Sequence, residues 1–183
     1  MKNTKVTLVP LTADDREQFI LDNQRAFKHG ISEGLDKCDA HLDDDEEIIS
    51  RKTIERCMDA PDSEVYRIVV DQKRVGGAIL RINEQTKCNE LEILFVSPDE
   101  HSVGIGYGAW QAIEALHPET EVWQTCTPYF EKRNIHFYVN KCGFSIDQFW
   151  CEHFAPEHRM PDEEECDPNE GPDEMFHFIK RMK

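Results

Sequence analysis

The sequence lacks any apolar run that approaches the roughly 20 residues of a membrane-spanning helix. It also lacks clusters of basic residues: 21 lysines and arginines stand against 37 acids, which gives a net charge of −16 at pH 7. Proteins that bind nucleic acid need clustered basic side chains to displace counterions from phosphate. These two absences argue against a helical membrane protein and against a nucleic-acid partner.

A secretion signal and a disulfide framework are also missing. The first residues, MKNTKVTLVPLTADD, contain no apolar core and no cleavage site. The seven cysteines are odd in number, and their spacing fits neither a disulfide framework nor a compact zinc template. We therefore expect a cytoplasmic protein with free thiols, without a metal site and without a membrane partner.

The acidic charge is concentrated in two segments of a chain that is otherwise ordinary in composition. Of the 183 residues, 39% are hydrophobic and 32% are charged, so we expect one globular domain over residues 1–183. Residues 36–47 carry seven acids and one lysine, and residues 161–174 carry eight acids and no base. Both segments are interpreted as solvated loops or as the source of an electric field that attracts a cationic substrate. The loop that contains most of the second segment is expected at about 156–172.

Hydrophobic periodicity predicts strands alternating with helices. Strands are expected at 5–9, 65–70, 75–82, 91–96, 121–127, 145–153 and 175–181, and helices at about 12–28, 46–58, 104–116 and 134–141. Thr12 is expected to cap the first helix with Asp15 as its capping-box partner, and residues 29–45 are predicted to form a connection. The three strands from 65 to 96 are expected to form a meander.

The most informative segment is LEILFVSPDEHSVGIGYGAWQAIEAL, residues 91–116. Leu91, Ile93 and Phe95 alternate with Glu92, Leu94 and Val96, which is typical of a strand covered on both faces. A glycine-rich loop and an amphipathic helix follow. Because a helix start offers unpaired N–H groups and glycines admit close approach, this arrangement predicts an anion site. A plain strand–loop–helix connection is the alternative.

Two other phosphate motifs fit this loop less well. Walker A requires Gly-Lys-Ser/Thr, and no lysine or arginine stands between Lys87 and Lys132. The run GIGYGA at 104–109 matches the loose dinucleotide pattern G-x-G-x-x-A, but no acid ends the next strand, where a ribose partner is expected. Another kind of nucleotide-binding protein therefore stays open as an alternative.

Residues 101–106, HSVGIG, resemble the acyl-CoA pyrophosphate loop of the GNAT superfamily of N-acetyltransferases, usually Gln/Arg-x-x-Gly-x-Gly/Ala. LFVSP at 94–98 resembles that family's strand before the loop, and RNIHFY with the later CGF resembles its second signature. Two departures are visible. His101 stands at the first loop position, and five steps separate Tyr138 from Gly143 where four is commoner.

The resemblance implies an α/β (α+β) fold of the GNAT type: a mixed, mostly antiparallel, splayed sheet with helices on both faces. It implies an acetyl-CoA-dependent N-acetyltransferase whose amine acceptor attacks the thioester directly. Strands 91–96 and 122–127 would splay apart, so that the edge groups of Phe95 and Val96 bond the pantetheine arm. The pyrophosphate would be held by His101, Ser102, Val103, Gly104, Ile105, Gly106 and Tyr107.

The resemblance also suggests catalytic residues. An amine with a pKa of about 10.4 is neutral only at the ~10⁻³ to 10⁻⁴ level at pH 7, so a carboxylate base assists its attack. Glu92 stands where several family members carry a catalytic glutamate, with Glu90 as a weaker substitute; an ion-paired or surface glutamate is the alternative. Tyr138 is predicted as the acid that protonates the thiolate, or else as a core tyrosine. Asn134 resembles the asparagine that bonds pantetheine, or caps a helix.

The expected substrate is a small-molecule or peptide amine. The excess of acidic residues favours a cationic amine. A homodimer is also considered. The alternative function is a non-catalytic acyl-CoA-binding or regulatory module on the same fold. No pattern in the sequence identifies the acceptor, because this fold supports many acceptors.

Overall fold

The computed structural model of the protein describes residues 5–34, 49–100, 104–151, 154 and 174–183. Its strands are β1 Val6–Pro10, β2 Ser63–Val70, β3 Lys73–Arg81, β4 Cys88–Val96, β5 Val122–Pro128, β6 Ser145–Trp150 and β7 Met175–Arg181. They form one sheet in the order β1-β2-β3-β4-β5-β7-β6. Neighbouring strands are antiparallel except β4 and β5, which are parallel.

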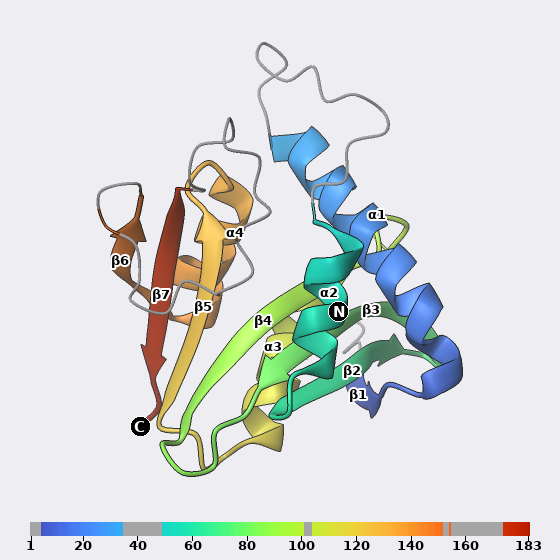
Figure 1. Ribbon diagram of the computed structural model, residues 1–183, viewed down its shortest axis with the longest axis horizontal. Coiled ribbons are helices and arrows are strands. Elements are labelled where there is room, and N and C mark those ends of the chain that lie inside the picture. The colour runs from blue at the N-terminus through green and yellow to red at the C-terminus, as the bar shows by residue number, and fades with distance from the viewer. Residues whose placement is uncertain (1–4, 35–48, 101–103, 152–153, 155–173) are drawn as a thin grey trace.

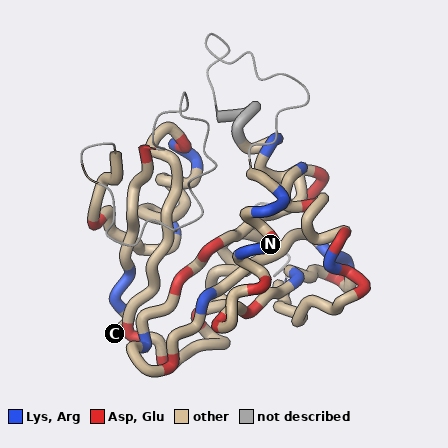
Figure 2. The backbone as a smooth tube through the Cα atoms, in the orientation of Figure 1, with Lys and Arg blue, Asp and Glu red and all other residues tan. Residues whose placement is uncertain are grey.

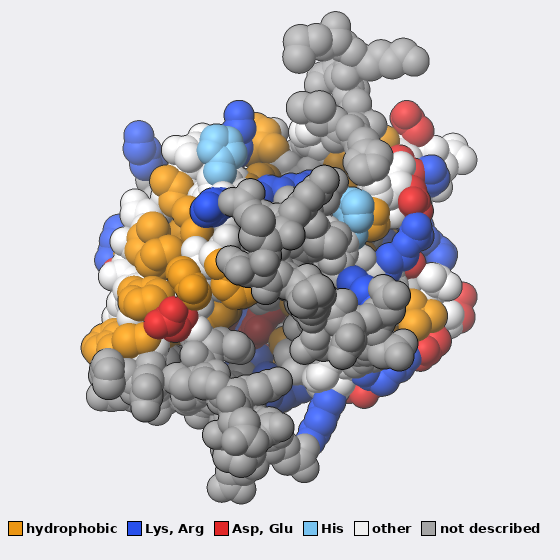
Figure 3. All heavy atoms as spheres, turned by 90° about the horizontal axis from the view of Figure 1, so that it is seen from above, with side chains coloured by type: hydrophobic (Ala, Val, Ile, Leu, Met, Phe, Trp, Pro, Cys, Tyr) orange, Lys and Arg blue, Asp and Glu red, His pale blue; other side chains and the backbone are white. Residues whose placement is uncertain are grey.

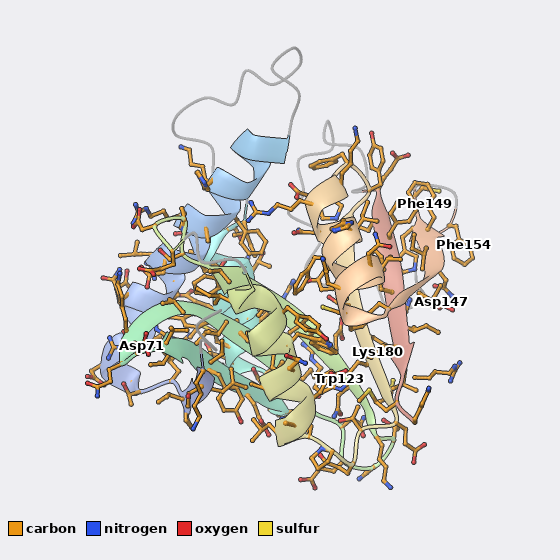
Figure 4. The ribbon with its side chains drawn as sticks, turned by 180° about the vertical axis from the view of Figure 1, so that it is seen from behind. Asp71, Trp123, Asp147, Phe149, Phe154 and Lys180 are labelled. Carbon is orange, nitrogen blue, oxygen red and sulfur yellow. The ribbon has the colours of Figure 1, made fainter. Side chains whose placement is uncertain are left out.

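Helices cover both faces of this sheet (Figure 1). α1 Arg16–Gly34 and α2 Arg51–Asp59 pack on one face, and α3 Ile105–Leu116 packs on the other. The second face also carries α4 Lys132–His136 and the π-helical turn η2 Phe137–Cys142 (Figure 4). The mixed, mostly antiparallel fold with helices on both faces, expected from the resemblance, is therefore confirmed.

The core is divided between the two faces. Under α3 the fully buried rings of Trp110 and Trp123 pack edge to face at 5.5 Å. Under α1 the ring of Phe19 packs edge to face against Phe95 at 5.2 Å. A Cβ at Gly77 would stand 2.3 Å from the Phe19 ring, so this contact requires glycine on β3. Phe95 thereby anchors the end of β4 against α1.

The first helix differs from the prediction at both ends. A 3₁₀ turn, Ala13–Asp15, precedes α1, and the Thr12 side chain makes no capping bond. The Asp15 carboxylate is not a capping partner, because it is buried and binds Arg67 Nε at 2.7 Å. α1 continues to Gly34 through residues expected to form a connection. Gly30 lies inside it, and the cost of about 1 kcal/mol for a helical glycine is too small to end a helix.

The second helix begins later than predicted. α2 starts at Arg51, where Ser50 is the N-cap and its hydroxyl accepts the Thr53 N–H at 3.0 Å. Acidic residues 46 and 47 were expected in its first turn, but residues 35–48 lie outside the described part of the chain. β6 is also shorter than expected, since it ends at Trp150.

β4 contains a bulge that shifts its alternation. Ile79 lies opposite Ile93, and Leu80 lies opposite Leu91, so Glu92 has no partner on β3. A bulge places two consecutive residues where one would stand, and the faces exchange beyond it. Leu91 therefore packs under α3, whereas Ile93 packs under α1 and α2. The prediction that Leu91 and Ile93 share one face was wrong.

Several large hydrophobic side chains are exposed around β6 and the connection from β5 to α4. Tyr129, Phe130, Phe149 and Phe154 are 38–54% exposed. Figure 3 views the molecule from the end at which β5 terminates, and hydrophobic side chains gather at the left of this view. Phe149 and Phe154 are labelled in Figure 4. The homodimer considered from the sequence stays a prediction.

Candidate active site

β4 and β5 pair only briefly and then separate (Figure 1). Their paired positions are Cys88–Val122, Asn89–Trp123 and Glu90–Gln124. Beyond these pairs, the edge of β4 that faces β5 has no strand partner in the described structure, and Phe95 and Val96 lie on this edge. Unpaired edge groups can bond an extended ligand as an added strand would. The predicted splay is present.

The start of α3 lies beside the end of this open edge. Gly104 is the N-cap with φ +103°, a left-handed conformation that favours glycine. A Cβ at Gly106 would stand 3.5 Å from the Phe137 ring and 4.0 Å from the Val96 side chain. The first turn of α3 is thus inserted between β4 and η2.

The predicted phosphate loop is only partly covered by the structure. Ile105 is 3% exposed and anchors the helix in the core, whereas Tyr107 is 41% exposed. His101, Ser102 and Val103 lie outside the described residues. The first N–H groups of a helix have no partner within the helix and its start is the positive dipole end, so the start of α3 at Gly104 suits an anion.

The segment with Tyr138 is π-helical rather than the α-helix predicted for 134–141. Two N–H groups, those of Gly143 and Phe144, bond the Tyr138 carbonyl, and the second bond measures 2.9 Å. Gly143 ends the turn with φ +80°. A π-turn accommodates one residue more than an α-turn. The five steps from Tyr138 to Gly143, one more than is common in the resembled family, are therefore accommodated by the local backbone.

Lys180 on β7 ties this turn to α3. Its Nζ donates to the Cys142 carbonyl at 2.6 Å and to the Glu114 carboxylate at 2.5 Å. It also lies 5.4 Å from the centroid of the Trp110 ring. Figure 4 shows Lys180 between α3 and the helical segment of α4 and η2. A cation at the end of a helical segment offsets its exposed carbonyls.

The Tyr138 phenol lies where β4 and β5 separate. Its ring is 7% exposed and packs against Phe144 and Phe178 at 5.6 and 5.5 Å. Its hydroxyl shares a hydrogen bond with Thr125, whose own hydroxyl donates to the Leu91 carbonyl at 2.9 Å. Burial raises the pKa of Tyr138 to about 12, and the bond with Thr125 opposes this shift in part. The phenol is therefore a protonated donor at neutral pH.

Two glutamates of β4 face the other side of the sheet. Glu92 Oε1 lies 2.9 Å from Arg81 Nη2, and Glu92 Oε2 lies 3.5 Å from the Cys57 thiol, which donates to it. The ion-paired environment considered for Glu92 is thus the one observed. Burial, and then the negative charge of Glu92, raise the pKa of Glu90 to about 7.

Both carboxylates are directed toward the side of β5 that carries Cys126. Burial raises the pKa of the Cys126 thiol, and the negative charges of Glu90 and Glu92 raise it further. A thiol in that environment is a poor nucleophile, because its thiolate is disfavoured. Figure 2 shows acidic positions along β4 near the centre of the molecule. The face of β4 opposite α3 is therefore acidic.

Asn134 lies at the open end of β5. Its Nδ2 donates to Thr127 Oγ1 at 3.2 Å, and the N-cap of α4 is Glu131. Asn134 is thus not a helix cap, and its amide lies beside the last residues of the strand that diverges from β4.

Within the described residues, no helix is long and apolar enough to cross a membrane. No group of three or more His, Cys, Asp or Glu side chains there is arranged to hold a metal ion.

Comparison with known proteins identifies the family. Residues 25–144 match the Acetyltransferase (GNAT) family. The chain belongs to this family. Over 180 residues it is 44% identical to the protein YrkN of Bacillus subtilis (strain 168), which is itself described as uncharacterized. That alignment covers 98% of this chain and 95% of YrkN.

Solved GNAT structures share the fold at low sequence identity. The spermidine N-acetyltransferase of Vibrio cholerae, in complex with CoA and spermine, has a TM-score of 0.64 and 12% identity, over 97% of this chain and 95% of that one. The ribosomal-protein-S18-alanine N-acetyltransferase of Escherichia coli has a TM-score of 0.64 and 13% identity, over 96% and 93%. These similarities show that the chain has the GNAT fold.

Sequence reasoning missed two contributors to this candidate site. Thr125, which links the Tyr138 phenol to β4, was noted only as a strand residue. Arg81, which holds Glu92, was expected only as one residue of the strand at 75–82. Their signals are weak in the sequence because both contacts join separate strands whose register is decided by the tertiary structure.

Proposed function

We propose that this protein is an acetyl-CoA-dependent N-acetyltransferase that transfers the acetyl group to an amine by direct attack on the thioester. The observation that carries the proposal is the position of the Tyr138 hydroxyl, bonded to Thr125 where β4 and β5 separate. An acid at that point is well placed to protonate a thiolate that lies between the two strands. Family membership supports acetyl transfer in general.

The open edge of β4 and the start of α3 form one continuous binding path in this proposal. The edge groups of Phe95 and Val96 bond the pantetheine arm, and the Asn134 amide contacts it from the β5 side. The pyrophosphate is held by N–H groups of the loop: His101, Ser102, Val103, Gly104, Ile105, Gly106 and Tyr107. Acetyl-CoA, when bound, supplies the activated acetyl group.

The chemistry then needs a base for the amine and an acid for the sulfur. Tyr138 is proposed as the acid, since its phenol keeps its proton at neutral pH. The base is proposed among the carboxylates of β4, with Glu92 acting directly or holding a water, and Glu90 beside it. The acceptor is proposed to be a small-molecule or peptide amine. The proposed compartment is the cytoplasm, as expected from the sequence.

Calorimetric titration with acetyl-CoA, with NADH as the control, tests the binding step. Saturable micromolar binding of acetyl-CoA alone is expected. Turnover is then measured with a panel of amines by mass spectrometry of the products, because this readout does not depend on a thiol reagent that the protein's own cysteines could consume. Absence of binding would contradict the whole proposal.

The alternative is a non-catalytic acyl-CoA-binding module. The ion pair of Glu92 with Arg81 favours this alternative, because a carboxylate paired with an arginine is a weaker base. Such a module would bind acetyl-CoA in the titration, show no acetylated product with any amine of the panel, and be unaffected by Tyr138→Phe.

A further inference from the structure

Two consecutive glycines on β3 lie against the end of β4. In the strand register Gly76 lies opposite Val96, and Gly77 lies opposite Phe95. A Cβ at Gly76 would stand 2.2 Å from the Phe95 carbonyl oxygen and 3.1 Å from the Val96 Cα. Real Cβ atoms essentially never approach another heavy atom closer than 3.0 Å, so any other residue at position 76 requires the backbone of β4 to move.

The second glycine makes room for aromatic rings. A Cβ at Gly77 would stand 2.3 Å from Phe19 Cε2 and 2.7 Å from Phe95 Cε1. Both atoms lie at the far ends of side chains, which move by changing their torsion angles. A strand backbone moves only by shifting its hydrogen bonds. Gly76 therefore accommodates the backbone of β4, whereas Gly77 accommodates a side chain of β4 and the ring that packs on it.

A bulge in β3 turns the first glycine toward β4. Ile68 and Val69 follow each other on β2, but the register between them skips Val75 of β3. A bulge bends its strand and increases the local twist. The Cβ position of Gly76 is thus directed at the neighbouring strand rather than away from the sheet. The Val75 carbonyl also accepts the Ser97 N–H at 2.8 Å, so β3 holds the chain immediately after β4.

This close approach decides where the end of β4 lies between its two neighbours. β4 stands between β3 and β5 in the sheet, and its pairing with β5 stops at Glu90. A strand that is drawn toward one neighbour lies farther from the other. Figure 1 shows β4 diverging from β5 on the side of β3. The proposed function places the pantetheine arm between these two diverging strands.

We propose that Gly76 and Gly77 are positioning residues for the acyl-CoA arm. They let the end of β4 lie against β3 and thereby set the separation from β5 that admits the arm. Both glycines act through Phe95 and Val96 and not by contact with the arm. This inference rests on the proposed function and adds to it the residues that fix the width of the binding path.

The ring of Phe19 holds this arrangement from the side of α1. It packs edge to face on Phe95 at 5.2 Å, and the Arg67 guanidinium lies 5.1 Å from its centroid. Arg67 is itself buried and bound to Asp15. Phe19 is therefore fixed between a buried ion pair and Phe95, and the two rings meet over Gly77.

The first experiment compares two ligands of Gly76→Ala by calorimetry. Acetyl-CoA carries the pantetheine arm, whereas adenosine 3′,5′-bisphosphate carries the nucleotide end of CoA without it. The added Cβ should push Phe95 and Val96 toward β5, so the affinity for acetyl-CoA should fall roughly 10- to 100-fold, as expected of overpacking by one methyl group. The affinity for adenosine 3′,5′-bisphosphate should stay within about threefold, because its phosphates bind at the start of α3.

Two controls separate this effect from a general loss of stability. Ile54→Val shortens a fully buried side chain that packs under α2, and it should lower the Tm without changing either affinity. Gly30→Ala adds a methyl group in α1 where nothing lies within 4 Å, and it should bind both ligands as the wild type does.

A double variant tests the difference between the two glycines. Gly77→Ala should also weaken acetyl-CoA binding, because its Cβ displaces the Phe95 ring. Phe19→Leu shortens the side chain that this Cβ meets first, so the double variant should recover most of the lost affinity. Phe19→Leu should not restore Gly76→Ala, whose added Cβ meets backbone. If Gly76→Ala does not fold, the loss and recovery in the Gly77 variants decide the inference.

Crystal structures of unliganded wild type and of Gly76→Ala, or of Gly77→Ala if the first does not fold, test the inference without acetyl-CoA. The Cα atoms of Phe95 and Val96 should lie closer to β5 in the variant, while β2 and β3 keep their places. A variant in which β3 moves instead of β4 would overturn the inference. If the wild type does not bind acetyl-CoA, the proposed function fails, and this comparison alone decides whether the glycines set the separation.

The binding results have equally definite outcomes. The inference is overturned if Gly76→Ala binds acetyl-CoA within about threefold of the wild type. Equal losses of affinity for acetyl-CoA and adenosine 3′,5′-bisphosphate would also overturn it, because the defect would then lie at the loop or in the fold as a whole. A loss of the same size in Ile54→Val would reduce the glycines to ordinary packing residues.

Discussion

Replacing Tyr138 with phenylalanine separates its catalytic role from its packing role. The change removes one hydroxyl and keeps the ring contacts with Phe144 and Phe178. Thr125 retains its bond to the Leu91 carbonyl, so no polar group of β4 is orphaned. We expect a stability loss of about 1 kcal/mol, or roughly 2–4 °C in Tm. If the phenol protonates the leaving sulfur, kcat should fall by about 10²–10⁴-fold.

The assay is steady-state turnover at saturating acetyl-CoA, together with calorimetry of acetyl-CoA binding. The Kd should stay within about twofold, because the hydroxyl acts only when the thiolate forms. With its pKa near 12, the phenol keeps its proton up to about pH 10, so the wild type should show no alkaline loss caused by Tyr138. Tyr129→Phe is the matched control, since Tyr129 is 48% exposed.

One result would refute the reasoning. If kcat of Tyr138→Phe stays within about threefold of the wild type while the Tm drops as expected, the phenol would be a core residue only. The hydrogen bond with Thr125 would then be a packing feature, and the acid would have to be water or another group.

Three further predictions test other parts of the structure. Gly104→Glu should abolish acetyl-CoA binding in calorimetry. Gly104→Ala should bind acetyl-CoA more weakly but measurably, because its Cβ meets open space although the φ angle is strained. Equal loss of binding in both variants would implicate backbone conformation rather than charge. Asp15→Ala should destabilise the fold by about 3–5 kcal/mol in urea unfolding, because Arg67 is 3% exposed and loses its bidentate partner; a loss under about 1 kcal/mol would contradict this. Lys180→Met should lower the Tm and kcat while leaving acetyl-CoA affinity unchanged, because the Cys142 carbonyl loses its 2.6 Å donor; an unchanged kcat would show that this contact does not position Tyr138.

The parts of the fold that depend on short stretches of chain could be predicted from the sequence. The meander β2–β3–β4 and the helix after the glycine loop were expected at nearly their observed bounds. Periodicity and turn-forming residues act locally, so they are visible without the tertiary structure. The predicted capping box of Thr12 and Asp15 was wrong because Asp15 binds Arg67, which lies far along the chain and is not visible in the local sequence.

The candidate site shows the same division. Local pattern indicated an anion site at Gly104, and the resemblance to the family pointed to Tyr138 and to the glutamates of the strand before the loop. The splay of β4 and β5 was expected from the resemblance, but only the tertiary structure decided that Glu90 is the last paired residue of β4. It also decided that a π-turn accommodates the extra residue before Gly143, and that Arg81 binds Glu92 rather than Glu90. Register and bulges depend on packing between distant segments, and a shift of one residue reverses every side chain, so no local pattern specifies them.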